Sequence, residues 1–342
     1  MVIDLRSDTF TLPSPEMLEV ILTAKLGDDV WREDPTVIEL EALAAKKLGK
    51  EAGLLVTSGT QGNLVSIMTH LNRGDGIVLE AECHTYLFEA GGFTSVVGAY
   101  PFLVKGNNGV MDPKDVEEIL TRPYNEHCVQ PKLLCIENTH NTGGGAVIPK
   151  ENIDTLAKIA HENNVAVHID GARIFNAAIA SGTPASSLVE NADSVQMCLS
   201  KGLGCPVGSV IVGTEEFIHR ARKNRKIVGG SMRQAGIIAA PGIYALNNMI
   251  DRLAEDHLHA KLITDELKAK VPNIKIKPVE TNLIVIDLSE TPWTAQEIQD
   301  RFEDKGIKMA SMGKYLLRMV TYFGISKEDI DTIVATIPEI FQ

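Results

Sequence analysis

The stretch Asp193-Ser-Val-Gln-Met-Cys-Leu-Ser-Lys201-Gly-Leu-Gly-Cys-Pro-Val-Gly-Ser209 decides the fold, because an apolar run stops in it at a lysine and closely spaced glycines follow. A short apolar run bounded by turn residues is typical of a buried strand, so Lys201 is predicted at a strand end. Gly202 and Gly204 have no Cβ, which lets the backbone turn tightly and approach a bound group. An amine in a partly dry site loses hydration, which favours its neutral form, and that form can attack an aldehyde. The alternative is a lysine that only extends from the strand end to water.

A second predicted strand lies upstream in the β-branched run Val165-Ala-Val-His-Ile-Asp170, which ends on a carboxylate followed by Gly171. In open α/β sheets, ligands bind at the carboxyl ends of the strands, so Asp170 and Lys201 can face one cofactor. A carboxylate keeps a pyridine nitrogen protonated, and a lysine holds an aldehyde as a Schiff base. The pair therefore predicts pyridoxal phosphate as the cofactor.

Two further segments fit this cofactor. Residues 54–56 are predicted to form a strand, Ser58-Gly59-Thr60 a turn, and the chain from there to about His70 a helix. A glycine-containing turn at a helix start presents free N–H groups to an anion, so this turn is the predicted phosphate site. The next predicted strand, 77–79, leads to His84, which is either a second cofactor contact or a loop histidine with local hydrogen bonds.

The charge composition indicates which kinds of binding partner are disfavoured. The chain has 342 residues, 33 Lys and Arg, 45 Asp and Glu and a net charge of -12, which disfavours nucleic acid and anionic membranes as partners. Five cysteines without Cys-x-x-Cys spacing predict neither disulfides nor a metal site. Early charges and the lack of a long apolar segment predict a cytoplasmic protein with no membrane contact.

Strands and helices alternate along the chain, which predicts an α/β fold with a mainly parallel sheet. We expect an N-terminal arm with a short helix at 1–33, outside the core. A large cofactor-binding α/β domain is expected at 34–255 and a small C-terminal α+β domain at 256–342. Asp34-Pro35 is predicted to start a helix that runs through Leu48. One helical stretch is expected from about 233 to 270, and the glycines at 143–145 are expected to form a flexible loop.

Six motifs occur in an order that resembles the low-specificity L-threonine aldolases of the beta-eliminating lyase/threonine aldolase family. They are Leu5-Arg-Ser-Asp-Thr9, Gly27-Asp-Asp-Val30, Glu33-Asp-Pro-Thr36, Glu137-Asn-Thr-His-Asn141, His168-Ile-Asp-Gly-Ala-Arg-Ile-Phe-Asn176 and Leu199-Ser-Lys-Gly-Leu-Gly204. The resemblance covers nearly the whole chain. It implies a fold type I transferase architecture dependent on pyridoxal phosphate, and cleavage of threonine or allo-threonine to glycine and an aldehyde. It also implies a homotetramer with sites at a dimer interface.

The resemblance assigns substrate contacts as well. It places Ser7 at the carboxylate of the amino-acid substrate, and Arg173 and Arg318 are suited to the same carboxylate because guanidinium groups bind carboxylates bidentately. Arg173 is expected to contact the cofactor too. Trp31, where relatives usually have tyrosine, is expected to close over the site of a neighbouring subunit or to pack a subunit interface. Tyr322 stands where relatives usually have histidine.

The same resemblance suggests a division of roles among the remaining polar residues. It implies that the imidazole of His84 stacks on the cofactor ring and that Arg233 reaches the phosphate across a subunit boundary. His84 and His127 are the candidates for the base that removes the β-hydroxyl proton, because imidazole titrates near neutral pH. Asp170 is expected to act in catalysis through the ring nitrogen.

Three other functions stay open from the residues alone. A β-eliminating lyase and an aminotransferase would share Lys201 and Asp170, and a regulatory protein that binds pyridoxal phosphate would need no catalytic base. Product analysis separates these classes, because each yields different products or none.

Overall fold

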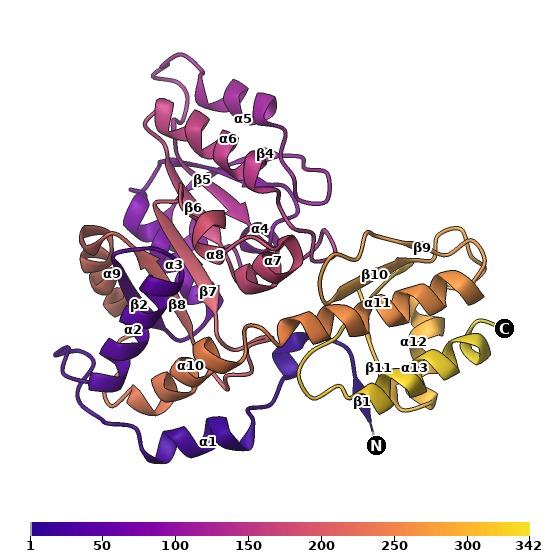
Figure 1. Ribbon diagram of the computed structural model, residues 1–342. Helices are drawn as coiled ribbons and strands as arrows, with labels where there is room; N and C mark the ends of the chain where they lie inside the picture. The colour runs from indigo at the N-terminus through magenta and orange to yellow at the C-terminus, as the bar shows by residue number, and fades with distance from the viewer. Residues whose placement is uncertain (1) are drawn as a thin grey trace.

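The computed structural model describes residues 2–342, so Met1, the first residue of the expected arm, lies outside it. Figure 1 shows a large lobe with a central sheet between helices and a smaller lobe that contains the C-terminus, with α11 (Leu253–Lys270) running between them. No helix within residues 2–342 has the length and apolar character needed to cross a membrane.

The central sheet has seven strands in the order β2-β8-β7-β6-β5-β3-β4. These strands are β2 (Ala52–Val56), β3 (Gly76–Glu80), β4 (Tyr100–Val104), β5 (Pro131–Glu137), β6 (Ala166–Asp170), β7 (Ser194–Cys198) and β8 (Ser209–Gly213). The pairs from β4 to β7 are parallel, and β8 is antiparallel to both of its neighbours. The prediction of an α/β fold with a mainly parallel sheet is therefore confirmed.

Helices pack on this sheet through apolar faces that form one large cluster and two smaller ones with it. They are α2 (Pro35–Lys47), α3 (Gly59–His70), α4 (His84–Leu87), α5 (Pro113–Leu120), α6 (Lys150–Glu162), α7 (Ile174–Ser181), α8 (Ala185–Leu188), α9 (Glu215–Ile227) and α10 (Gly236–Asn248). The start of α2 is as the sequence predicts. The Asp34 side chain accepts hydrogen bonds from the N–H groups of Thr36 and Val37, and Pro35 occupies the first helical position, where no N–H is needed.

The smaller lobe combines an antiparallel sheet with helices. Its sheet has the order β12-β13-β10-β9, and a separate parallel pair joins β1 to β11. The strands are β1 (Ile3–Asp4), β9 (Lys275–Ile276), β10 (Leu283–Asp287), β11 (Ile307–Lys308), β12 (Ala310–Ser311) and β13 (Leu316–Val320). The helices α12 (Ala295–Asp304) and α13 (Lys327–Ile340) complete it, whereas α1 (Pro15–Leu22) lies against α10.

The expectation that residues 1–33 lie outside the core is wrong. Ile3 and Leu5 belong to the apolar core of the smaller lobe, and Met17 is fully buried in the core of the larger one. Ile3 is buried because β1 pairs with β11, two segments far apart in the sequence, and Met17 is buried because α1 packs on α10. Local sequence patterns do not indicate such a long-range pairing. The sequence of a buried two-residue strand therefore looks the same as that of an exposed arm.

Two other local expectations also differ from the structure. The stretch 233–270 forms two helices, α10 and α11, and the break lets Leu253 pack over Gly202, where an added Cβ would lie 3.0 Å from the Leu253 side chain. The glycines at 143–145 are buried rather than flexible. Gly145 has φ 74°, and a Cβ there would collide with Thr281, so this loop is packed between the lobes.

Candidate active site

Lys201 and Asp170 meet at one cavity of about 210 Å³ at the carboxyl end of the central sheet. Asp170 is the last residue of β6, and Lys201 follows the end of β7 by one short turn. Because β6 and β7 are parallel neighbours, their carboxyl ends lie at the same edge. The cavity is lined by Ser58, Gly59, Thr60, Asn63, His84, Glu89, Asp170, Ala172, Gln196, Cys198, Ser200 and Lys201. The sequence-predicted ring, aldehyde and phosphate contacts therefore come together, except Arg173 and Arg233.

The start of α3 fits a phosphate group. Ser58 is the extended N-cap residue, and its Oγ accepts a hydrogen bond of 3.1 Å from the N–H of Gln61. The N–H groups of Gly59 and Thr60 belong to the first helical turn, whose donors have no intrahelical acceptor. A Cβ on Gly59 would lie 2.7 Å from Cys198 Sγ, so only glycine fits between the helix start and β7. This turn can therefore receive an anion from free backbone donors.

Asp170 is buried and held from two sides. Its Oδ1 accepts from the N–H of Ala172 at 3.1 Å, and its Oδ2 accepts from Asn63 Nδ2 at 2.8 Å. Both bonds fix the orientation of the carboxylate, which is the group that can face a pyridine nitrogen. None of the quoted sequence motifs contains Asn63. The one available signal is its type, because asparagine is disfavoured inside a helix.

His84 is anchored by two carboxylates. Its backbone N–H donates to Glu137 Oε2 at 2.7 Å, and its ring Nδ1 lies 2.9 Å from Glu89 Oε1. Burial lowers the pKa of His84, but the hydrogen bond to Glu89 and the charges of Asp170 and Glu89 outweigh this and raise it above the ordinary imidazole value. With Nδ1 engaged by Glu89, Nε2 is the ring atom left to exchange a proton. Glu89 is not identifiable from the sequence, because its contacts depend on the fold, whereas Glu137 stands at the start of the motif Glu137-Asn-Thr-His-Asn141.

His84, Glu89 and Asp170 also have the chemistry of metal ligands. One ligand atom from each lies within 4.8 Å of the others. However, Asn63 Nδ2 already donates to both carboxylates, and Nδ1 of His84 is bonded to Glu89. Asp170 and His84 suit a pyridine ring, because the carboxylate can face its nitrogen and the imidazole its surface.

A second cavity of about 400 Å³ adjoins the first and shares His84 and Lys201 with it. Ser7, Asn141, Arg173 and Arg318 also line it. Arg318 donates through Nη1 to Asn141 at 3.3 Å and through Nη2 to the carbonyl of Arg6 at 3.1 Å. Within residues 2–342, its buried Nε has no hydrogen-bond partner. Burial and the neighbouring Arg173 charge lower the pKa of Arg318, so this cavity favours an anionic ligand.

Arg173 lies in the expected cavity but has a partner that the sequence analysis does not foresee. Its Nε and Nη2 each donate to a carboxylate oxygen of Asp8 at 2.7 Å, and both side chains are buried. Burial raises the pKa of Asp8, but the Arg173 charge outweighs it and brings the pKa to about 2. The bidentate edge of Arg173 is thus occupied, which leaves Nη1 for another ligand. Asp8 follows Ser7 directly, so the Ser-Asp pair in the first motif is the signal that could have pointed to it.

Three sequence-predicted site residues lie elsewhere on the chain. His127 lines a different cavity of about 450 Å³ beside Tyr100 and Phe102. Trp31 is exposed, and Arg233 forms an exposed ion pair of 2.9 Å with Asp28. These three residues do not line either cavity at Lys201. For Trp31 and Arg233, the resemblance implies contacts with the site of a neighbouring chain.

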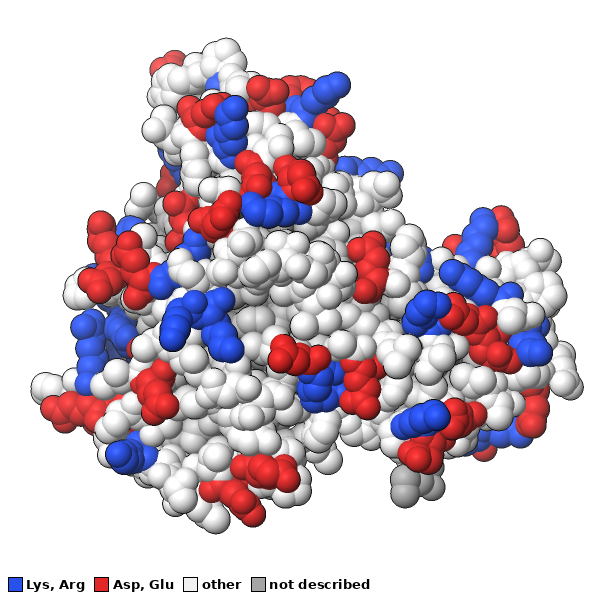
Figure 2. All heavy atoms as spheres, viewed as in Figure 1, with Lys and Arg blue, Asp and Glu red and all other residues white. Residues whose placement is uncertain are grey.

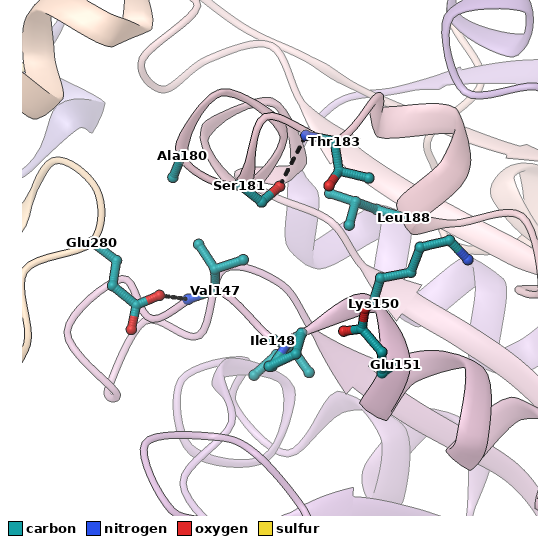
Figure 3. Close-up of a pocket in the computed structure, with 10 residues that line it drawn as sticks. Val147, Ile148, Lys150, Glu151, Ala180, Ser181, Thr183, Leu188 and Glu280 are labelled. Atoms are coloured by element: carbon teal, nitrogen blue, oxygen red, sulfur yellow. Dashed lines mark hydrogen bonds between the residues drawn. The ribbon is translucent and has the colours of Figure 1, made fainter.

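A cavity of about 470 Å³ between α6, α7 and Glu280 has different chemistry (Figure 3). The Glu280 carboxylate accepts from the N–H of Val147 at 3.1 Å. Lys150 forms ion pairs with Asp154 and Glu190. Lys150 and Glu280 are thus bound to other groups of the protein, whereas the cavity of about 400 Å³ at Lys201 is lined by Arg318, whose Nε has no hydrogen-bond partner within residues 2–342. We therefore assign the active site to the cavities at Lys201.

Comparisons with known proteins identify the family of the chain. A model of the beta-eliminating lyase family matches residues 4–291. Low-specificity L-threonine aldolase 1 of Arabidopsis thaliana is 41% identical over 333 residues, covering 96% of this chain and 93% of that protein. The low specificity L-threonine aldolase of Escherichia coli (strain K12) is 39% identical over 334 residues, with 98% of both chains covered.

Among solved structures, the threonine aldolase of Leishmania major matches with a TM-score of 0.86 at 17% identity, covering 99% of this chain and 100% of that one. The expected architecture, that of the fold type I transferases dependent on pyridoxal phosphate, is confirmed. The chain therefore belongs to the beta-eliminating lyase family and is a homologue of the low-specificity L-threonine aldolases.

Proposed function

We propose that this protein is a pyridoxal-phosphate-dependent aldehyde-lyase that cleaves L-threonine, L-allo-threonine and other β-hydroxy-α-amino acids to glycine and an aldehyde. The observation that carries the proposal is the junction of two cavities at His84 and Lys201. One cavity suits a phosphorylated pyridine aldehyde, and the other suits a small anionic substrate. Full-length relatives named as threonine aldolases support the same reaction.

The residues of the first cavity would hold pyridoxal phosphate at each of its functional groups. Lys201 would bind the aldehyde, Asp170 the ring nitrogen, and the helix start at Ser58, Gly59 and Thr60 the phosphate. When bound, the cofactor supplies an electron sink for the bond that breaks. The protein contributes the Asp170 carboxylate, which the amide of Asn63 and the N–H of Ala172 hold in place.

The second cavity would orient the substrate through its carboxylate. Arg318 offers its guanidinium group, and Ser7 offers a hydroxyl at the same cavity. Arg173 adds its remaining Nη1, because Asp8 holds the rest of the guanidinium. Fixing the carboxylate and the amino group places the third substituent of Cα. That placement decides whether the Cα–Cβ bond or another bond is broken.

The proton of the β-hydroxyl has to leave as the Cα–Cβ bond breaks. In neutral His84, Nδ1–H donates to Glu89, so the lone pair of Nε2 can take this proton directly or through water. The hydroxyl oxygen becomes the aldehyde oxygen, and the bonding electron pair stays with Cα. A proton returned to Cα then gives glycine. His127 is the alternative base, and it requires a second chain because it lies in a separate cavity.

We further propose that the active unit is a homotetramer, with sites at a dimer interface, in the cytoplasm. Exposed apolar side chains support an interface along the N-terminal segment, since Leu12 is 76%, Leu22 86% and Trp31 72% exposed. Figure 2 shows acidic and basic side chains mixed over this face of the molecule. Beside α9, a cavity of about 340 Å³ is lined by Arg32, His219, Arg222, Lys223, Arg225 and Lys226 together with Asp29. On a chain of net charge -12, such a cavity favours a local anion, such as the phosphate end of a neighbour's site.

Product analysis tests the reaction. Purified protein supplied with pyridoxal phosphate and L-threonine should form acetaldehyde and glycine in equal amounts. A keto acid with ammonia would instead indicate β-elimination, and exchange of the amino group with a keto acid would indicate an aminotransferase. Either outcome, or cofactor binding without turnover, would contradict the proposal.

Complementation tests the shared site. The variants Lys201→Ala and Arg233→Ala should each be inactive alone, and mixed assemblies should regain part of the activity because one site keeps both residues. A fully active isolated monomer would refute the assembly, while the reaction would stand.

A further inference from the structure

Asn63 occupies the point at which the two acidic residues of the active site meet. It lies in α3 and is 1% exposed. Its Nδ2 donates to Glu89 Oε1 and to Asp170 Oδ2, both at 2.8 Å, and its Oδ1 lies 3.1 Å from His168 Nε2. Both N–H groups of the amide are therefore used on carboxylates. The reverse orientation of the amide would direct an oxygen at two carboxylates, so the observed orientation is the stable one.

The orientation of this amide fixes the tautomers behind it. Since Asn63 Oδ1 can only accept, His168 Nε2 carries a proton. Burial lowers the pKa of His168 to about 4, so its ring is neutral near pH 7 and Nδ1 is an acceptor. Ser194 Oγ lies 2.8 Å from this Nδ1 and 2.7 Å from Nε2 of His70, whose pKa is lowered by burial to about 3. A neutral, one-directional chain of donors therefore runs from His70 through Ser194 and His168 to Asn63.

The same amide separates two like charges. Ligand atoms of Glu89 and Asp170 lie within 4.8 Å of each other in a buried cavity. Without a donor between them, one carboxylate would take up a proton or turn away. The carboxylate of Glu89 also receives the His84 ring, so any movement of Glu89 moves the imidazole. Asn63 thus touches the partners of both His84 and the cofactor nitrogen.

We propose that Asn63 is a positioning residue that holds Asp170 and the His84–Glu89 pair in one arrangement, an inference that rests on the proposed function. Its amide keeps the Asp170 carboxylate directed at the ring nitrogen and keeps Nδ1 of His84 on Glu89. The chain through His168 keeps the amide itself from rotating. Asn63 and the phosphate-binding residues Gly59 and Thr60 all lie in α3. The helix therefore links the position of the amide to that of the phosphate-binding turn.

The substitution Asn63→Leu tests the proposal, because leucine is similar in size and has no polar atom. A lost hydrogen bond to a charged group weakens binding by about tenfold to a hundredfold, so cofactor-free Asn63→Leu should bind pyridoxal phosphate more weakly by about that factor. The visible circular dichroism per bound cofactor should also fall, because the ring is held less firmly. With saturating cofactor, kcat should drop while KM for threonine stays within about twofold, since the carboxylate contacts are unchanged.

Asn152→Leu is the matched control. Asn152 is also a helix asparagine, but its amide donates to the carbonyl of Met111 at 3.0 Å, away from the site. This variant should leave cofactor affinity and dichroism unchanged even where the free energy of unfolding falls. If Asn63→Leu does not fold, Asn63→Ser, which keeps one donor, should show a smaller change in the same direction.

The outcomes separate this inference from the proposed function. The positioning role would be overturned if cofactor affinity, dichroism and kcat were unchanged in Asn63→Leu, or in Asn63→Ser if that is the variant that folds. Cleavage of threonine by the wild-type protein would still support the reaction in that case. If wild-type protein bound the cofactor but formed no aldehyde, a loss of affinity and dichroism in the variant would support the role of Asn63 and refute only the reaction.

Discussion

Replacing Asp8 with asparagine should destabilise the protein far more than removal of an ordinary ion pair. The substitution keeps the shape of the side chain but leaves the Arg173 guanidinium buried without a counter-charge. The pKa of Asp8 is lowered from 3.8 to about 2 in the folded protein, and one pKa unit corresponds to about 1.36 kcal/mol, so the ionised form gains about 2.5 kcal/mol. Breaking a buried pair from one side costs about 3–5 kcal/mol. We therefore expect the free energy of unfolding to fall by about 2–4 kcal/mol.

The measurement is urea unfolding of the cofactor-free protein at pH 7 and equal protein concentration. Asp265→Asn is the control, because Asp265 forms an exposed ion pair with Lys261, and such pairs contribute less than about 1 kcal/mol. The pH dependence gives a second check. Since the folded pKa of Asp8 is lowered, its contribution is complete above about pH 4 and is lost as the pH falls through about 2. The stability difference between wild type and Asp8→Asn should shrink over that range.

Equal stability of Asp8→Asn and wild type at pH 7 would refute this reasoning. It would mean that Arg173 finds another counter-charge or that the pair is solvated in the protein. A decrease as small as that of Asp265→Asn would lead to the same conclusion.

Three further predictions concern the site. Borohydride reduction of the yellow holoenzyme should attach the cofactor to Lys201, and a label found by peptide mapping on another lysine would contradict the assignment. His84→Phe should lower kcat substantially, because an aromatic face remains but the proton acceptor at Nε2 is lost. His127→Asn should instead alter the erythro/threo preference. If His84→Phe kept full kcat and His127→Asn lost its activity, the two roles would be reversed. Because burial lowers the pKa of His168 from 6.5 to about 4, unfolding takes up a proton there, so stability should decrease as the pH is lowered from about 6.5 to 4. Urea unfolding of His168→Gln should show a weaker decrease, and an identical profile would contradict the neutral state of this histidine.

Much of the cofactor site is determined by the sequence alone. Lys201, Asp170 and the turn at Ser58 each stand where a short apolar run ends, and the parallel sheet brings such ends to one edge. These features are local, since strand ends, glycine turns and helix caps depend on a few neighbouring residues. The limits of most predicted elements therefore agree with the structure to within a few residues.

What only the tertiary structure decided is which polar groups share a hydrogen bond. Asp8 pairs with Arg173, and Asn63 donates hydrogen bonds to both Glu89 and Asp170. Asp8 is far from Arg173 in the sequence, and Asn63 is far from Asp170. The pairing of β1 with β11 and the separate cavity of His127 have the same origin. Such contacts depend on how whole elements pack, because a buried donor bonds to whichever acceptor the fold brings within about 3 Å, and no local pattern specifies that acceptor.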